Sequence, residues 1–414
     1  MKVIVANYRY FIAGGPENYM FKFMEAAKKK GIEVIPFSIN NPQNEFTPYR
    51  KYFAKPRSNQ LMYSDTKKSI KNIMGMVRAT VWNYDAEYKL RKLIRDTKPD
   101  ALYILHEINH LSPSIIRAAE KEGVRVVHRI SDFFMFCPRY DFLCKNEICE
   151  ECLHGNYKKA LKYRCVKESL SATWIRIVAM KFYKKIRIFD KVDQFVCTCE
   201  FSKQKLIEGG IDAKRISCIP TFINATNITP QYSNNGYFLF LGRMAHQKGV
   251  IYAIESMKYL KDSNCVLKIT GEITDSEEDQ KIWRYIKENR LEKKIIFTGF
   301  VKGEKLENLI KNAICIVCPA IWYENMPNTV IESYAYGKPV VASRIGSLSE
   351  IVDDGETGFL FEMKNSRILA EKLKYFIDDP NLACIMGQNA RKKCEKEYSE
   401  RRHFHELIPV LLDK

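Results

Sequence analysis

The sequence predicts an α/β protein of two doubly wound domains that face a cleft, and three observations support this prediction. Short apolar segments of strand type alternate with helical segments, an order typical of parallel α/β sheets. The alternation occurs in two series, which the polar stretch 224–236 separates. The length of 414 residues exceeds one ordinary domain and fits two or three.

The first series is expected to form an N-terminal domain, residues 1–223. Gly31 closes its first helix, because glycine is a favourable residue just after a helix end. Residues 41–75 are polar and irregular, and we expect an insertion or loop there. The expected elements are strands at 3–6, 34–37, 101–105 and 124–130 and helices at 17–30, 84–96 and 112–123.

The second series is expected to form a C-terminal domain, residues 237–397, after a linker at 224–236. A helix should begin near Gly249. The final segment, 398–414, is expected to cross back to the first domain. The expected strands are 237–241, 266–270, 295–297, 314–317 and 340–342.

Composition narrows the class of protein and its partners. Hydrophobic residues make up 46% and charged residues 28%, as in ordinary globular proteins. The net charge of +18 favours anionic partners, which include phosphates, nucleic acid and acidic membranes. The sequence contains neither a signal-peptide pattern nor an apolar run of the roughly 20 residues that a membrane span needs. We therefore expect a cytoplasmic protein whose 13 cysteines are reduced.

The most informative segment lies between two predicted strands of the second domain. Glu324 and Glu332 stand eight residues apart, and Pro327 between them suits the first position of a helix. The N–H groups of Asn328 to Val330 would then be free to face an anion. Glu324 follows a strand directly, and ligands of open α/β sheets bind at the carboxyl ends of strands.

Two cations follow the first strand of the second domain, within the sequence Gly242-Arg243…Lys248-Gly249. Arg243 can donate a fork of hydrogen bonds to two oxygens, and Lys248 can supply a point charge. Both could therefore reach one diphosphate group. The alternative is a pair of solvated surface cations.

These motifs, with the trailing Ala-x-Gly-Lys-Pro-Val-Val, resemble the retaining glycosyltransferases of family 4 (glycosyl transferases group 1, polysaccharide-biosynthesis type), which have two Rossmann-like domains in the GT-B fold. The resemblance implies transfer of a sugar from a nucleotide-diphosphate donor to an acceptor hydroxyl with retention. It implies that Arg243 and Lys248 stabilise the leaving diphosphate, that Glu324 orients the sugar and that Glu332 binds the ribose. The other donor-binding positions that it implies are Gly14, Gly15, Gly242, Gly299, Met326, Pro327, Asn328, Thr329 and Val330.

Candidates for the acceptor side lie in the first domain. His106 falls at the end of a predicted strand, where it could face the cleft or be a structural histidine. The resemblance places a histidine near the reacting sugar at a position that is Ser131 here, whereas His128 lies earlier in the strand. Either Asp132 takes part at this position, or Ser131 lines the acceptor site.

A cluster of cysteines is a candidate metal site. The spacing of Cys144, Cys149, Cys152 and Cys165 could supply four thiolates to a structural zinc ion. Isolated thiols and an iron–sulfur cluster are the alternatives. No cofactor is expected for catalysis, because the sequence lacks the Asp-x-Asp motif of metal-dependent glycosyltransferases.

The stretch 155–191 holds 11 Lys or Arg and two acidic residues. Its apolar residues are spaced as on one helical face, namely Ile175, Val178, Ala179, Phe182, Ile186 and Phe189. One interpretation is peripheral binding to the anionic inner leaflet, near a lipid-linked or glycan acceptor. The other is an ordinary helix that packs on its own core.

Two weaker alternatives to the glycosyltransferase function are a nucleic-acid-binding protein and an inactive nucleotide-sugar-binding relative. We expect no nucleic-acid partner.

Overall fold

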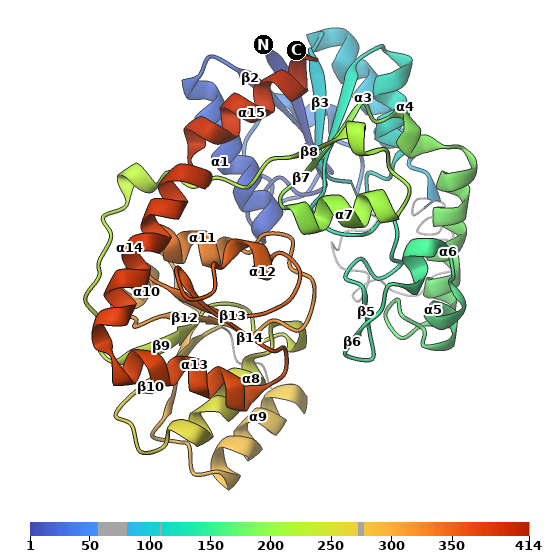
Figure 1. The fold of residues 1–414 in the computed structure, drawn as a ribbon. Coiled ribbons are helices and arrows are strands. Elements are labelled where there is room, and N and C mark those ends of the chain that lie inside the picture. Colours follow the sequence, from blue (N-terminus) through green and yellow to red (C-terminus); the bar gives the residue numbers. More distant parts are fainter. Residues whose placement is uncertain (57–80, 108–109, 272–276, 414) are drawn as a thin grey trace. The chain divides into compact units, whose positions relative to one another are not determined.

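The computed structural model describes residues 1–56, 81–107, 110–271 and 277–413, so part of the irregular segment expected at 41–75 lies outside the described residues. The chain divides into two compact units, each with its own six-stranded sheet (Figure 1). Unit 1 comprises Met1–Thr198, Ser202–Ile219 and Phe404–Lys414, and unit 2 comprises Cys199–Phe201 and Pro220–His403.

The sheet of unit 1 is parallel and has the strand order β2-β1-β3-β4-β7-β8. Its two last strands, of four and three residues, were not expected from the sequence. The strands are β1 Lys2–Asn7, β2 Glu33–Phe37, β3 Ala101–His106, β4 Arg125–Arg129, β7 Gln194–Cys197 and β8 Ile216–Cys218.

Helices cover this sheet, and a small hairpin follows β4 (Figure 1). The helix α3 begins where the side chain of Asn83 accepts a hydrogen bond from Ala86 N–H at 3.0 Å, and it ends at the left-handed residue Lys98. The remaining elements are α1 Gly15–Lys29, α3 Tyr84–Thr97, α4 Ser114–Lys121, β5 Leu143–Cys144, β6 Glu147–Ile148, α5 Lys158–Lys162, α6 Leu170–Lys185, α7 Glu200–Glu208 and α15 Glu400–Leu412.

The sheet of unit 2 is also parallel, in the order β11-β10-β9-β12-β13-β14. Its edge strand β14 was not expected, and it pairs closely because Gly358 has no side chain: a Cβ there would lie 1.9 Å from the carbonyl oxygen of Val340. The strands are β9 Tyr237–Phe240, β10 Val266–Thr270, β11 Ile295–Gly299, β12 Ile316–Cys318, β13 Val340–Ser343 and β14 Gly358–Phe361. The helices are α8 Val250–Ser256, α9 Glu277–Glu288, α10 Glu304–Lys311, α11 Asn328–Ala335, α12 Leu348–Ile351, α13 Ser366–Asp378 and α14 Pro380–Glu397.

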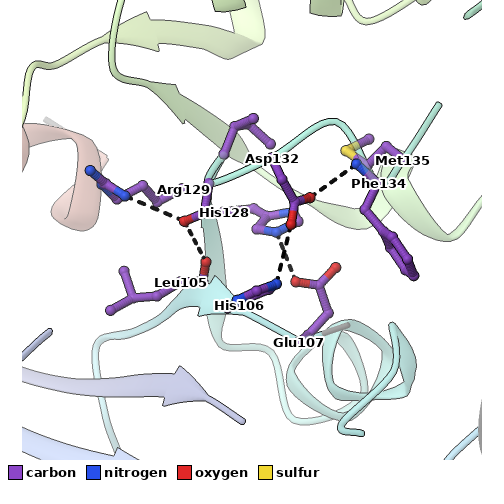
Figure 2. Close-up of a pocket in the computed structure, with 10 residues that line it drawn as sticks. Leu105, His106, Glu107, His128, Arg129, Asp132, Phe134 and Met135 are labelled. Carbon is purple, nitrogen blue, oxygen red and sulfur yellow. Dashed lines mark hydrogen bonds and ion pairs between the residues drawn. The ribbon is translucent and has the colours of Figure 1, made fainter. Parts of the chain in front are cut away.

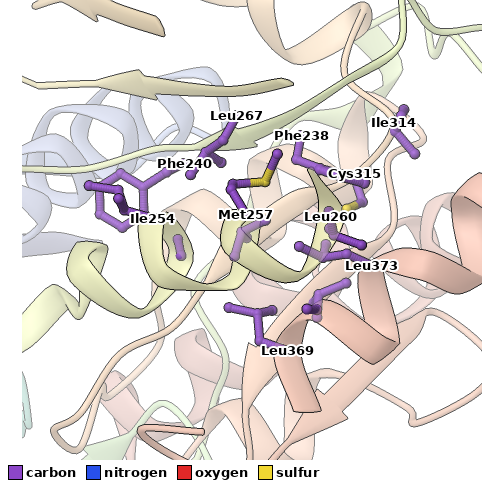
Figure 3. Packing of buried hydrophobic residues seen from close by; sticks show 14 of the residues in the cluster. Phe238, Phe240, Ile254, Met257, Leu260, Leu267, Ile314, Cys315, Leu369 and Leu373 are labelled. Atoms are coloured by element: carbon purple, nitrogen blue, oxygen red, sulfur yellow. The ribbon is translucent and has the colours of Figure 1, made fainter. Parts of the chain in front are cut away.

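One face of the unit 2 sheet packs against α8 and α13 (Figure 3). Phe238 and Phe240 of β9 are buried, as are Ile254 of α8 and Leu369 of α13. Burial of side chains of this size contributes about 1.5–3 kcal/mol each. This packing fixes the direction of β9, and so the start of the loop that carries Arg243.

The helix α6 exposes part of the apolar face that the sequence indicated, for which both membrane contact and packing on the protein core were open interpretations. Its buried residues are Thr173, Arg176, Ile177, Ala179, Met180 and Tyr183, whereas Val178 and Phe182 of that face are exposed. The guanidinium group of Arg176 packs inward over the ring of Phe134. An exposed apolar stripe results, with a four-residue spacing: Leu170, Trp174, Val178 and Phe182.

None of the helices in the described parts of the chain has both the length and the apolar character needed to cross a bilayer.

Candidate active site

In unit 2 the structure joins two of the predicted catalytic residues. The Lys248 ammonium group donates to Glu324 Oε1 at 2.5 Å, and Trp322 Nε1–H donates to the same oxygen at 2.8 Å. Glu324 is buried, with 7% of its surface exposed, and Ser347 Oγ donates to its backbone carbonyl at 2.7 Å. The carboxylate is therefore held in place by charge and by two directional hydrogen bonds.

Glycine brings Lys248 to this position. Gly249 ends the short 3₁₀ helix His246–Lys248 in the left-handed region, at φ 68°. A Cβ on Gly249 would lie 1.9 Å from the carbonyl oxygen of Pro319, so no other residue fits. The close approach places Lys248 beside the loop after β12, which carries Glu324. Trp322 was not among the predicted site residues, because its spacing to Glu324 carries no known signal.

The helix that follows Glu324 begins one residue later than expected. Pro327 is the N-cap of α11 rather than its first helical residue. The N–H of Val330 donates to the Pro327 carbonyl oxygen at 3.1 Å, so the expectation that it is free was wrong. Asn328 and Thr329, half-buried at the first turn, keep the N–H groups that a helix start leaves without intrahelical partners.

The other predicted donor-side residues of unit 2 lie at strand ends, on the loops that follow them or on α11. Gly242 and the exposed Arg243 follow β9, and Gly299 ends β11 in the left-handed region at φ 70°. Within the described residues, Arg243 forms no ion pair. Glu332 lies half-buried on α11, and Met326 Sδ accepts a hydrogen bond from Thr221 N–H at 3.2 Å. Of the predicted catalytic residues, Lys248 and Glu324 are in direct contact.

In unit 1 the ends of β3 and β4 form a polar pocket that contains all three predicted acceptor-side residues (Figure 2). His106 Nε2 lies 3.2 Å from Asp132 Oδ2, and Ser131 Oγ donates to the carbonyl of Leu105 at 2.9 Å. Asp132 Oδ1 accepts a hydrogen bond from Phe134 N–H at 3.0 Å. His106 therefore has a carboxylate partner on the neighbouring strand end.

A second histidine–carboxylate pair lines the same pocket, and the sequence did not predict it. His128 Nε2 lies 3.0 Å from Glu107 Oε2, and both residues are buried. Burial by itself raises the pKa of Glu107, but the charge and hydrogen bond of His128 outweigh it and lower the pKa. The Nδ1 atoms of both His106 and His128 are buried without a hydrogen-bond partner among the described residues. Each pair therefore leaves one imidazole nitrogen of its histidine buried and without a partner among the described residues.

The charge of His106 is set by its surroundings. Burial lowers the pKa of His106, but the hydrogen bond and charge of Asp132, with the charges of Glu107 and Glu17, raise it above the ordinary value. Tyr8 packs its ring edge-on against the imidazole at 4.9 Å. Burial, with the nearby carboxylates, raises the pKa of Tyr8 to about 12, so its hydroxyl stays protonated at neutral pH.

The glycine loop of unit 1 contains a carboxylate that we did not predict as a site residue. Gly14 is the N-cap of α1, and Gly15 is its first residue. Glu17 is 2% exposed in the first turn, and its Oε1 accepts a hydrogen bond from Asn7 Nδ2 at 3.3 Å. A negative charge therefore already lies at this helix start, which weakens it as a phosphate site.

The predicted zinc ligands lie together only in part. The sulfurs of Cys144 and Cys165 are 3.8 Å apart. Across the described residues, no three His, Cys, Asp or Glu side chains are arranged to hold a metal ion. The predicted set of four thiolates is therefore not assembled in this structure.

Comparison with known families assigns the chain to a class of enzymes. The model of Glycosyltransferase Family 4 matches residues 13–227, more than half of the 414, and that of Glycosyl transferases group 1 matches residues 223–393. The second match contains the loop with Lys248 and Glu324. The first contains the pocket with His106 and Asp132.

Individual relatives agree with this assignment. The UDP-Gal:alpha-D-GlcNAc-diphosphoundecaprenol alpha-1,3-galactosyltransferase of Escherichia coli is 25% identical over 317 residues, which cover 72% of this chain and 78% of that protein. An uncharacterised glycosyltransferase of Methanocaldococcus jannaschii is 33% identical over 175 residues, but these cover only 42% of this chain and 43% of the archaeal protein.

A solved structure has the same fold. Anabaena HepE, in complex with UDP and glucose, superposes with a TM-score of 0.68 over 100% of both chains, at 13% identity. This likeness concerns the fold alone. Together with the family matches and the two parallel sheets, it shows that the chain belongs to the group 1 glycosyltransferases, family 4, and has their GT-B fold of two Rossmann-like domains.

Proposed function

We propose that the protein transfers a sugar from a nucleotide-diphosphate donor to an acceptor hydroxyl with retention of configuration. The observation that carries this proposal is the contact of Lys248 with the buried carboxylate of Glu324. A buried carboxylate needs a cation, and this pair lies where the resemblance places the donor's sugar and diphosphate.

Lys248 and Glu324 would each have a role in donor binding. Lys248 and the exposed Arg243 would neutralise the charge that develops on the leaving diphosphate. Glu324 would accept hydrogen bonds from sugar hydroxyls, with Trp322 holding it in position. Glu332 would bind the ribose. We further propose a front-face reaction, in which the leaving phosphate takes the proton of the acceptor hydroxyl and no enzyme nucleophile forms a covalent intermediate.

Unit 1 would bind the acceptor. Its pocket is lined by His106, His128 and Asp132, and imidazole and carboxylate side chains can form hydrogen bonds with sugar hydroxyls. The E. coli relative is named for an acceptor on diphosphoundecaprenol, and HepE was solved with UDP and glucose. We therefore propose a UDP-sugar donor and a lipid-linked or glycan acceptor, in bacterial surface polysaccharide or glycolipid assembly.

The exposed apolar stripe of α6 supports binding of the protein to the inner face of the cytoplasmic membrane. Trp174 and Leu170 are 59% and 52% exposed, and the basic residues Lys181, Lys184 and Lys185 are exposed on the same helix. Apolar and cationic side chains together favour anionic lipid surfaces. We propose peripheral binding there, and a reaction that requires no metal ion.

The test is donor binding and turnover by the purified protein. We would screen UDP-, GDP-, ADP- and dTDP-sugars for a rise in melting temperature, because a ligand that binds only the folded state stabilises it. One donor should shift the wild type and release its nucleotide slowly. Glu324→Gln and Lys248→Met should lose that release by about 100-fold or more. Activity should persist in EDTA, and NMR of the glycosylated product should show the donor's anomeric configuration.

Lys258→Met is the matched control, since Lys258 is an exposed lysine of the same unit outside the site. It should retain the wild-type shift and rate. Stabilisation by a donor without any turnover would favour an inactive nucleotide-sugar-binding relative. The absence of both with every nucleotide sugar would contradict the proposal.

A further inference from the structure

The ion pair of unit 2 joins two side chains to which the proposed function gives different parts of the nucleotide sugar. The Lys248 ammonium group donates to Glu324 Oε1 at 2.5 Å, and Lys248 forms no other ion pair among the described residues. Under the proposed function, on which this inference rests, Lys248 binds the diphosphate and Glu324 binds sugar hydroxyls. A bound nucleotide sugar therefore competes with the contact that the structure shows.

The backbones that carry the two side chains are fixed to each other. In the loop after β12, Ile321 N–H donates to the carbonyl oxygen of Gln247 at 3.0 Å, and Gln247 directly precedes Lys248. Ser347 Oγ, which is fully buried, donates to the backbone carbonyl of Glu324 at 2.7 Å. Any change in the ion pair is therefore a movement of side chains.

Lys248 is the member of the pair that is free to move. Its side chain is 24% exposed, whereas that of Glu324 is 9% exposed. An ammonium group on a flexible four-carbon stem can rotate toward solvent and keep its hydration. The buried carboxylate has no such freedom, and without its cation it depends on the hydrogen bonds that remain.

Trp322 contacts both members of the pair through different parts of its indole ring. Its Nε1–H donates to Glu324 Oε1 at 2.8 Å, the oxygen that also accepts from Lys248. The ammonium group of Lys248 lies 5.6 Å from the centre of the ring, within the range of a cation–π contact. The N–H bond to Glu324 does not involve Lys248, so it remains when the ammonium group moves.

We propose that binding of a nucleotide-diphosphate sugar moves the Lys248 ammonium group from Glu324 to the diphosphate, and that Trp322 is the positioning residue that keeps Glu324 in place after this exchange. Before binding, Lys248 neutralises the buried carboxylate. After binding, hydroxyl groups of the sugar and the indole N–H donate to the carboxylate in its place. The ion pair of this structure is thus the state of the protein without donor.

The exchange would also favour release of the product. After transfer the nucleoside diphosphate is still bound, but the sugar that donated to Glu324 is now on the acceptor. The buried carboxylate has lost those hydrogen bonds and attracts Lys248 back from the diphosphate. Glu324 should therefore weaken the binding of a nucleoside diphosphate that carries no sugar.

The test is the affinity of the full chain for UDP, GDP, ADP and dTDP, measured by titration calorimetry. The nucleoside diphosphate that binds the wild type should bind Glu324→Gln at least about threefold more tightly, because Lys248 then has no ionic partner to leave. Adding Glu324→Gln to Lys248→Met should give no gain, and this non-additivity shows that the effect acts through Lys248.

Three results would overturn the exchange. One is an equal or weaker affinity of Glu324→Gln for the nucleoside diphosphate. Another is a gain that persists in the Lys248→Met background, which would mean that removal of a negative charge is enough. The third is the absence of nucleoside diphosphate binding by both the wild type and Glu324→Gln, which keeps the shape of the site.

A change of one group at Trp322 tests the positioning role. Trp322→benzothienylalanine, made by codon suppression, keeps the shape and face of the ring but has sulfur in place of the N–H. We expect kcat to fall about tenfold while the affinity for nucleoside diphosphate stays at the wild-type value. The same change at Trp283, which is 40% exposed on α9, is the control and should alter neither. An unchanged kcat, or a lost nucleotide affinity, would overturn the role of Trp322.

The exchange and the proposed function can fail separately. A gain of affinity in Glu324→Gln that requires Lys248, without turnover of any nucleotide sugar by the wild type, would support the exchange and contradict the transferase. Turnover by the wild type without that gain would support the transferase and overturn the exchange.

Discussion

The contact between His106 and Asp132 determines how the charge of the unit 1 pocket responds to pH. The two side chains come from neighbouring strand ends and lie 3.2 Å apart. Because the folded pKa of His106 is raised above the ordinary value of about 6.5, the protonated imidazole is the favoured form at mildly acidic pH. The pair therefore contributes stability that is fully present below about pH 6.5 and is lost as the pH rises through the folded pKa.

Asp132→Asn should remove most of this contribution. We expect the pKa of His106, followed by NMR, to fall, and the free energy of unfolding to decrease by about 1–3 kcal/mol at pH 5.5. The decrease should shrink as the pH rises past the folded pKa of His106. Asp190→Asn, a change at an exposed residue of the same unit, is the control and should leave the titration unaltered. An unchanged His106 pKa in Asp132→Asn would refute this reading of the pair.

Lys338 predicts the opposite pH dependence of folding stability to that of His106. It is 1% exposed, its ammonium group donates to the Ser233 carbonyl at 2.7 Å, and burial lowers its pKa to about 8. Between about pH 8 and 10.4 the unfolded chain binds a proton that the folded chain does not, so this residue makes stability rise with pH there. In urea titrations from pH 7 to 10, the wild type should gain of order 2 kcal/mol relative to Lys338→Met. Parallel pH profiles for the two proteins would contradict the prediction.

Some of these residues could be found from the sequence and others could not. Lys248 and Glu324 belong to motifs whose spacing relative to strands is visible along the chain, and the structure joins them. Glu107 and His128 form their pair because β3 and β4 are neighbours with a particular register, which pairs Ile104 with His128. A single sequence does not contain that register, so the second pair was not predicted.

Whole strands and helices, like single residues, could be predicted from the sequence only in part. Strands such as β10, with five residues and a clear apolar pattern, were predicted at their observed bounds. The strands β7 and β8, which follow the basic segment, were not predicted, although β9 and β12 of similar length were. For α6, the helical period was visible, but it left open which apolar residues face the core, and the structure buries Ile177 while it exposes Val178 and Phe182. Tertiary packing decides that choice, and periodicity alone does not.

The exposed stripe of α6 leads to a test at the level of this helix. Trp174→Ser should weaken binding to phosphatidylglycerol vesicles about tenfold in sedimentation assays, because about 1.5 kcal/mol or more of apolar contact is lost. Binding to phosphatidylcholine alone should be weak, and salt should reduce binding to anionic vesicles. Ile385→Ser, at a residue 54% exposed on α14, is the control and should bind like the wild type. Equal binding of Trp174→Ser and wild type would exclude α6 as the membrane contact.

At the scale of the whole molecule, unit 1 is formed by two parts of the sequence that lie before and after unit 2. The ring of Phe404 in α15 stacks on that of Phe23 in α1 with a centroid separation of 5.4 Å. Leu407 and Leu411 are buried in the same unit. The crossing back expected from residue 398 occurs in this structure between His403 and Phe404, where the assignment changes from unit 2 to unit 1.

Phe404→Ala should therefore destabilise unit 1, although the residue is ten positions from the chain end. Removal of a buried aromatic ring costs about 3–5 kcal/mol. We expect urea unfolding, followed by circular dichroism, to show a transition at lower concentration than in the wild type. His405→Ala, at the exposed neighbouring position, should unfold like the wild type. Equal midpoints for Phe404→Ala and His405→Ala would show that α15 does not contribute to the core.

The position of α15 also orders events during biosynthesis. A ribosome makes Phe23 before unit 2 and Phe404, Leu407 and Leu411 after it, so the nascent N-terminal part of unit 1 waits for α15 through the synthesis of unit 2. Domains usually fold in the order in which they emerge. Here unit 2, residues 199–201 and 220–403, is fully synthesised before unit 1 can close, and the exposed apolar surface of the incomplete unit is the part that chaperones would recognise during translation.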